Sequence, residues 1–316
     1  MKYGDMLTRA LAITWRHKYL WLLALFAGEG AMFGLQNSQG LQGRQNGGGF
    51  QPGTGASGQF TAWAVAHSGL LWSAAIVLAL LLIVLLLVSA VANGALIRAA
   101  AEHDQERPFD LRLAWRSGVR TFWPVLQMKL MTLVVALATL LVIGSFALVA
   151  FAGGRAGYVA LAVAAGVSAG LLFLLAIAFW IVFSVAVLLA MRAIVLDGKR
   201  PLTALRSAFE LIRRRLGRVA LVWLLAGVAG IVGGIAVGFA VVIVALPLAG
   251  IVAGTYFAAG VPAAVGAGIV AGLIWLAVLL ALSGAVNAFT SNFWTLSYTR
   301  LDQEPQPVAV GSPLPA

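Results

Sequence analysis

The basic residues of this chain are confined to short segments that alternate with long apolar stretches. Of the 21 Lys and Arg residues, 19 fall in four such segments, and only Arg44 and Arg155 lie elsewhere. Apolar stretches of about 20 residues cross a bilayer as helices, and loops that carry Lys and Arg stay on the cytoplasmic side. The alternation therefore predicts an all-α polytopic membrane protein with both termini cytoplasmic.

The composition also indicates a membrane protein, and it limits the kinds of partner that the chain is expected to bind. With 62% hydrophobic and only 10% charged residues, the chain has too little polar surface for a soluble globule. The net charge of +11 lies beside the apolar stretches, which favours anionic lipid headgroups over nucleic acid. The chain has no cysteine, so disulfides, thiol chemistry and cysteine-bound metals are excluded.

Six apolar stretches are long enough to be spans within a single membrane domain of residues 1–300. They cover about 19–35, 70–97, 122–152, 158–190, 219–246 and 262–296. Residues 36–60 are rich in Gly, Gln, Asn and Ser, which predicts a flexible outer loop. Residues 301–316 predict a disordered cytoplasmic tail.

The segments before the odd-numbered spans predict a threefold internal repeat. Each segment places apolar residues three or four positions apart beside arginines, as on one face of an amphipathic helix. These residues are Leu7, Leu11 and Trp15; Leu111, Trp115 and Val119; and Leu205, Phe209 and Ile212. In the even-numbered spans, Ser89 and Asn93 recur as Ser283 and Asn287.

These patterns predict three parallel units, each an interfacial amphipathic helix followed by a helical hairpin. The units cover about 5–98, 108–192 and 201–300, and would be related by an axis along the membrane normal. The alternative is that any basic amphipathic junction before a span looks alike.

Two groups of arginines are candidate contacts for lipid headgroups. They are Arg112, Arg116 and Arg120 in the second amphipathic segment and Arg213, Arg214 and Arg215 in the third. An Arg beside an anionic membrane surface contributes about 1 kcal/mol to binding. The alternative is that these residues serve only as topology anchors.

Glu29, Asn93 and Asn287 form the candidate intramembrane polar site. Glu29 lies about 15 Å along a helix from Tyr19, near the bilayer midplane, where a carboxylate often marks a transport path. Alternatively, Gly28 and Gly30 end the helix early and leave Glu29 in the outer headgroup zone. The two asparagines favour hydrogen bonding between helices.

The fifth span carries Gly230, Gly234 and Gly238 at intervals of four residues, a pattern that permits close helix packing. The sequence leaves two packing partners for this glycine strip: the sixth span of the same chain, or a second copy of the chain in a homo-oligomer.

Enzyme chemistry has little support in the residues. The three histidines, His17, His67 and His103, fall at or outside the span ends, so we expect no buried catalytic or metal cluster. The run Glu102–Asp104 resembles a metal site only by composition and is interpreted as a solvated polar loop. We expect no cofactor and no resident metal.

Two segments carry a family resemblance. Asp197–Leu205, continuing to Arg218, and Ser291–Tyr298 resemble a poorly characterised group of bacterial six-span proteins. That group is similar to the membrane domain accompanying some glycerophosphodiester phosphodiesterases. The resemblance covers most of the chain in topology and implies an accessory role in the bacterial cytoplasmic (inner) membrane. The phosphodiesterase chemistry belongs to a soluble domain outside this sequence, so no catalytic residue carries over.

Three functional hypotheses follow from the sequence. The first is a non-enzymatic membrane module that organises lipid or a partner protein. The second is a transporter of a small solute or lipid that uses Glu29, and the third is an intramembrane enzyme.

Overall fold

A computed structural model describes residues 3–28 and 67–303, and this part of the chain is built from α-helices. The helices are α1 (Tyr3–Arg16), α2 (Tyr19–Ala27), α5 (Ser68–Asp104), α6 (Leu111–Arg120), α7 (Phe122–Arg155), α8 (Val159–Asp197), α9 (Pro201–Arg214) and α10 (Leu216–Gln303).

Four of these helices, α5, α7, α8 and α10, are long and apolar enough to cross a membrane. They contain 37, 34, 39 and 88 residues, whereas about 20 suffice for one crossing. Such helices are typical of an integral membrane protein. α5, α7 and α8 coincide with the second, third and fourth predicted spans.

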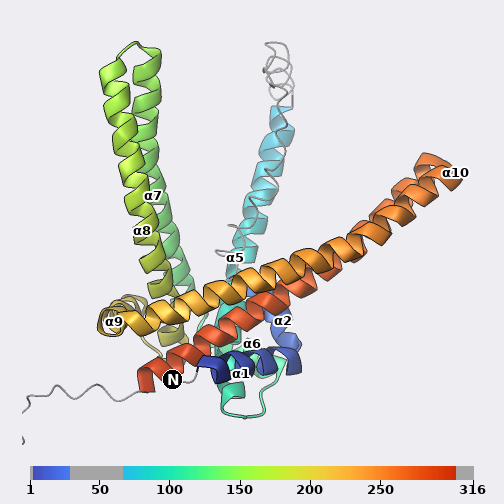
Figure 1. Ribbon diagram of the computed structural model, residues 1–316, viewed down its shortest axis with the longest axis horizontal. Helices are drawn as coiled ribbons and strands as arrows, with labels where there is room; N and C mark the ends of the chain where they lie inside the picture. The colour runs from blue at the N-terminus through green and yellow to red at the C-terminus, as the bar shows by residue number, and fades with distance from the viewer. Residues whose placement is uncertain (1–2, 29–66, 304–316) are drawn as a thin grey trace, which may run out of the picture.

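The fourth long helix, α10, is interrupted at Gly260, where φ is 78° and ψ is −172°. Glycine tolerates this positive φ because it has no Cβ. The chain folds back there, so residues 216–259 form a first limb and residues 261–303 a second limb (Figure 1). A Cβ built on Gly233 would lie 3.0 Å from Val286, which places the limbs side by side far from the turn.

The structure describes only the beginning of the first predicted span, and it shows the early helix end that was one of the two alternatives for Glu29. Helix α2 has nine residues and ends at Gly28, whose φ of 72° gives a left-handed C-cap. Its length is about 14 Å, half of what the hydrocarbon core requires. The rest of that span, Glu29 and the loop of residues 36–60 lie outside the described residues.

The helices form a base from which three arms diverge (Figure 1). The base contains α1, α6 and α9 together with the adjoining ends of α2 and of the long helices. The arms are α5, the α7–α8 pair and the two limbs of α10. Apolar side chains on the arms are exposed, for example Leu80 (58%), Leu141 (71%) and Ile243 (68%), as expected of a surface that faces lipid.

Residues 291–298 of α10 are buried on every side of the helix. Phe293, Trp294 and Leu296 are at most 1% exposed, and so are the polar residues between them. The hydroxyls of Thr295 and Ser297 donate to carbonyl oxygens one turn earlier on α10, at 2.8 and 2.7 Å. Leu301 is also buried and α10 runs to Gln303, and the rest of the predicted tail lies outside the described residues.

Helices α5 and α6 cross closely at two glycines. A Cβ on Gly118 would overlap the carbonyl oxygen of Val91 and lie 3.0 Å from the side chain of Ala95. A Cβ on Gly94 would lie 3.3 Å from Gly118 Cα. Neither position has room for a side chain, so both fix the crossing of α6 over α5.

The glycine strip of α10 has a different environment. An added Cβ would meet no atom within 4 Å at Gly230 or Gly238, whereas Gly233 packs against Val286. The contact between the limbs therefore uses Gly233, which lies outside the predicted set of Gly230, Gly234 and Gly238. An oligomer interface through that set stays a prediction.

We expect Gly118→Ala to destabilise the protein by about 1–3 kcal/mol, because α6 must shift to relieve the overlap with α5. The matched control is Gly144→Ala on α7, where an added Cβ has open space and Ala improves helix propensity. Thermal unfolding in detergent measures both. Equal midpoints for the two variants would contradict the close crossing.

Candidate functional site

A polar cluster surrounds the C-terminal end of α2. The carbonyl oxygen of Ala27 accepts hydrogen bonds from Ser89 Oγ at 2.9 Å and Lys129 Nζ at 3.1 Å. Asn93 Nδ2 lies 3.5 Å from the same oxygen, and Lys129 Nζ also donates to Ser89 Oγ. A cation is favoured here because the C-terminus of a helix carries partial negative charge.

Lys129 is a site residue that the sequence analysis missed. It lies about 10 Å along α7 from the start of the helix, inside a predicted span. A charged residue within a span is costly and usually has a partner. This cost could have identified Lys129 from the sequence as a residue with a buried partner. The sequence analysis instead counted Lys129 with the basic segment before the span.

Two of the three residues of the predicted polar site, Asn93 and Asn287, lie in the described part of the chain, and their surroundings differ. Asn93 is 2% exposed and belongs to the cluster, while its Oδ1 has no hydrogen-bond partner among the described residues. Asn287 is half-buried on the second limb of α10, and no hydrogen bond of its side chain occurs in the described ranges. Glu29 lies outside them.

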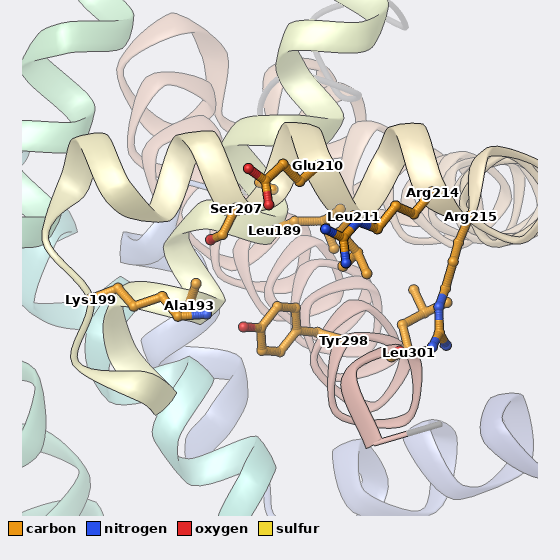
Figure 2. Close-up of a pocket in the computed structure, with 11 residues that line it drawn as sticks. Leu189, Ala193, Lys199, Ser207, Glu210, Leu211, Arg214, Arg215, Tyr298 and Leu301 are labelled. Atoms are coloured by element: carbon orange, nitrogen blue, oxygen red, sulfur yellow. Dashed lines mark hydrogen bonds between the residues drawn. The ribbon is translucent and has the colours of Figure 1, made fainter. Parts of the chain in front are cut away.

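A basic pocket of about 180 Å³ lies where α8, α9 and α10 meet. Its cations are Lys199, Arg214 and Arg215, against a single lining carboxylate from Glu210. Figure 2 shows Lys199 and Tyr298 on one side of the hollow and Arg214 and Arg215 along another.

Several polar groups of the basic pocket are held in place. Tyr298 donates to Asp197 Oδ2 at 2.6 Å, and Lys199 Nζ lies 3.0 Å from the same oxygen. Arg215 Nη1 donates to the carbonyl oxygen of Leu301 at 2.7 Å. The pocket is therefore fixed from α8 and α10 as well as α9.

The predicted headgroup arginines are distributed over two places. Arg214 and Arg215 line the basic pocket, whereas Arg213 is exposed on α9 outside it. All three arginines of the other group, Arg112, Arg116 and Arg120, are exposed on α6.

Arg192 is a second cation that sequence reasoning missed. It is fully buried, and its guanidinium donates to the carbonyl oxygens of Leu188 at 2.6 Å and Ser291 at 3.4 Å. It therefore connects α8 to α10. Its position at the end of a span had suggested only a topology signal.

Glu102–Asp104 is not a solvated loop, contrary to the expectation. These residues form the end of α5, and Glu102 and His103 are each 8% exposed. The acids are held by neighbouring arginines: Arg98 lies 2.8 Å from Glu102, and Arg9 lies 2.6 Å from Asp104.

Two histidines come together at this end of α5. The rings of His17 and His103 stack with centroids 3.7 Å apart. The Tyr19 hydroxyl donates to the carbonyl oxygen of Phe109 at 3.1 Å and lies 2.6 Å from His103 Nε2.

The pKa of His103 is lowered to about 4, first by burial and then by the nearby His17, while the charges of Asp110 and Glu102 act in the opposite direction. His103 is therefore neutral near pH 7. No group of three or more His, Asp or Glu side chains that could hold a metal occurs in residues 3–28 and 67–303.

Comparison with models of protein families gives a match over most of the chain. The model of a family of unknown function, DUF7544, matches residues 8–304. This match carries no link to glycerophosphodiester phosphodiesterases. No curated protein and no solved structure matches the chain.

We expect the stability of the protein to fall as the pH drops from about 6.5 towards 4. The unfolded chain protonates His103 near pH 6.5, whereas the folded protein resists protonation until about pH 4. The unfolded state therefore binds more protons in this window, and stability is lost on acidification, by about 1–2 kcal/mol at pH 5.

His103→Gln tests this linkage, because the amide can still hydrogen-bond to Tyr19 but does not titrate. The thermal unfolding midpoint at pH 7.5 and pH 5 should fall less in this variant than in the wild type. An identical fall in both proteins would show that His103 is not the titrating group.

Proposed function

We propose, from the premise that the chain belongs to the family of unknown function DUF7544, that it is a non-enzymatic module binding anionic lipid headgroups at the bacterial cytoplasmic membrane. The single observation that carries the proposal is the basic pocket formed by α8, α9 and α10. Its lining carries Lys199, Arg214 and Arg215 and the carboxylate of Glu210, and Asp197 beside the pocket pairs with Lys199.

The base is assigned to the cytoplasmic side of the membrane. The basic segments lie in α1, α6, α9 and the adjoining ends of the long helices, and cytoplasmic loops carry the excess of Lys and Arg. The exposed arms cross the bilayer, with the two limbs of α10 as separate crossings. Counting the chain from α2 to α5 as the first hairpin, the protein has six spans with both termini inside.

The short helices α1, α6 and α9 are assigned to the membrane interface. Each packs against the protein through a small residue and exposes the larger apolar residue that follows it. The buried residues are Thr14, Gly118 and Ala208, and the exposed ones are Trp15, Val119 and Phe209. A helix with this surface places its apolar residues among acyl chains while its arginines reach phosphates.

Packing between the helices supports the threefold repeat. Helix α6 packs mainly on α5, α9 on α8, and α1 on α10. Each interfacial helix thus contacts the second span of the preceding unit. Because α1 of the first unit packs on α10 of the third, the three units are arranged in a closed ring. The base ends of α5, α8 and α10 also contact one another pairwise.

The basic pocket suits a headgroup more than a whole ligand. Its volume of about 180 Å³ is below the range of about 300–1,000 Å³ typical of small-molecule sites. Arginine is well matched to phosphate because its planar fork donates two parallel hydrogen bonds. A pocket between spans on the basic side is the usual place for an anionic headgroup.

Other roles stay predictions. Transport through Glu29 depends on a residue outside the described ranges. A protein partner or homo-oligomer has no contact surface assigned to it.

We expect Lys199→Gln/Arg214→Gln to weaken phosphatidylglycerol binding at least about tenfold more than the control Arg206→Gln/Arg213→Gln. The two double variants remove the same charge, but the control residues do not line the pocket. Native mass spectrometry titrations in mild detergent measure the difference. Equal losses would show that binding depends on diffuse surface charge.

The proposed topology is testable because the chain has no cysteine. In intact cells, a membrane-impermeant maleimide should label Ala156→Cys, in the outer turn between α7 and α8, but not Gln105→Cys at the base. Gln105→Cys should react once the cells are opened. The reverse labelling pattern would place the base outside.

A further inference from the structure

An apolar groove lies between α2, α5 and α6, apart from the basic pocket. Its volume is about 380 Å³, within the range of ligand sites. The walls are Leu22, Leu23, Phe26, Val88, Ala92, Leu111 and Trp115, and the one charged lining residue is Arg112. Leu23 and Ala92 are buried at the floor, whereas Leu22, Phe26 and Trp115 are 40–54% exposed at the rim.

The length of the groove corresponds to one leaflet of the bilayer. Helix α2 begins at the base and is about 14 Å long, and half of a hydrocarbon core is about 15 Å. The groove follows α2 as far as Phe26 and α5 as far as Val88. The next residues, Ala27 and Ser89, belong to the polar cluster with Lys129. The apolar part of the groove therefore ends at this cluster.

Arg112 supplies a cation at the base end of the groove. Neighbouring arginines are occupied by carboxylates: Arg98 and Arg107 pair with Glu102, and Arg9 with Asp104. Asp110, the nearest acid in sequence, lies close enough to His103 to influence its titration. Within residues 3–28 and 67–303, Arg112 makes no ion pair or hydrogen bond.

We propose that this groove binds one phospholipid, with an acyl chain between α2 and α5 and the phosphate at Arg112. The apolar walls match a hydrocarbon chain, and the exposed rim leaves the groove open sideways to the bilayer. Arg112 matches the charge of the phosphodiester, which phosphatidylglycerol and phosphatidylethanolamine share. The site uses no residue of the basic pocket, but its depth in the bilayer rests on the topology proposed above.

Occupancy of the groove is tested by filling it. Leu22→Trp places a larger side chain on the wall, and Leu82→Trp is the control, because Leu82 is exposed on α5 and lines no part of the groove. Native mass spectrometry counts the phospholipids retained by each protein after delipidation. We expect one phospholipid fewer in Leu22→Trp than in the wild type and in Leu82→Trp.

The headgroup contact is tested by Arg112→Gln against Arg116→Gln, an exposed arginine of the same helix outside the groove. Arg112→Gln should weaken binding of phosphatidylglycerol and phosphatidylethanolamine at least about tenfold more than the control. Diacylglycerol, which lacks the phosphate, should bind the wild type correspondingly weakly.

Three results would overturn the proposal: equal lipid retention in Leu22→Trp and Leu82→Trp, equal effects of the two arginine substitutions, or diacylglycerol binding as tight as that of the phospholipids. If Leu22→Trp does not fold, Phe26→Trp fills the same groove at another rim position. Lys199→Gln/Arg214→Gln should retain the groove lipid, which separates this site from the basic pocket.

Discussion

The whole base depends on the burial of the last turns of α10 among the other helices. This segment carries serine, threonine and asparagine side chains, which are costly to bury unless they are hydrogen-bonded. Thr295 and Ser297 donate within α10, and Asn292 Nδ2 donates to Thr14 on α1 at 2.9 Å. Arg192 from α8 reaches Ser291 on the same segment. Helices from all three proposed units therefore meet at α10, and the arms can diverge because the base alone holds them together.

A second constraint is the early end of α2. A helix end that is buried away from water leaves carbonyl groups that need hydrogen-bond partners from elsewhere in the protein. Lys129 and Ser89 satisfy the carbonyl oxygen of Ala27 from two other helices. The end of α2 also bounds the apolar groove, because Phe26 is the last residue of α2 that lines it. One local feature thus connects the cationic cluster with the proposed lipid site.

Much of the helical architecture could be predicted because it depends on local signals. The apolar stretches of α5, α7 and α8, the turn near Gly157 and the start of α9 at Pro201 follow from hydropathy, glycine and proline. Lys129 and Arg192 were missed because a cation near a span end looks like a topology signal. Glu102 and His103 were assigned to a loop because polar composition does not reveal that the corner between α1 and α2 covers them.

The sequence by itself determined where the chain is apolar, where it is basic, and which segments become helices. These properties arise from side chains within a few turns of one another, so periodicity and composition are sufficient to predict them. Only the tertiary structure decided which polar groups meet: Lys129 with Ala27, Tyr298 with Asp197, and His17 with His103. These pairs join helices distant in sequence, and their contacts depend on how the helix ends converge at the base. The basic pocket and the apolar groove have the same origin, because each is the space left where three helices meet.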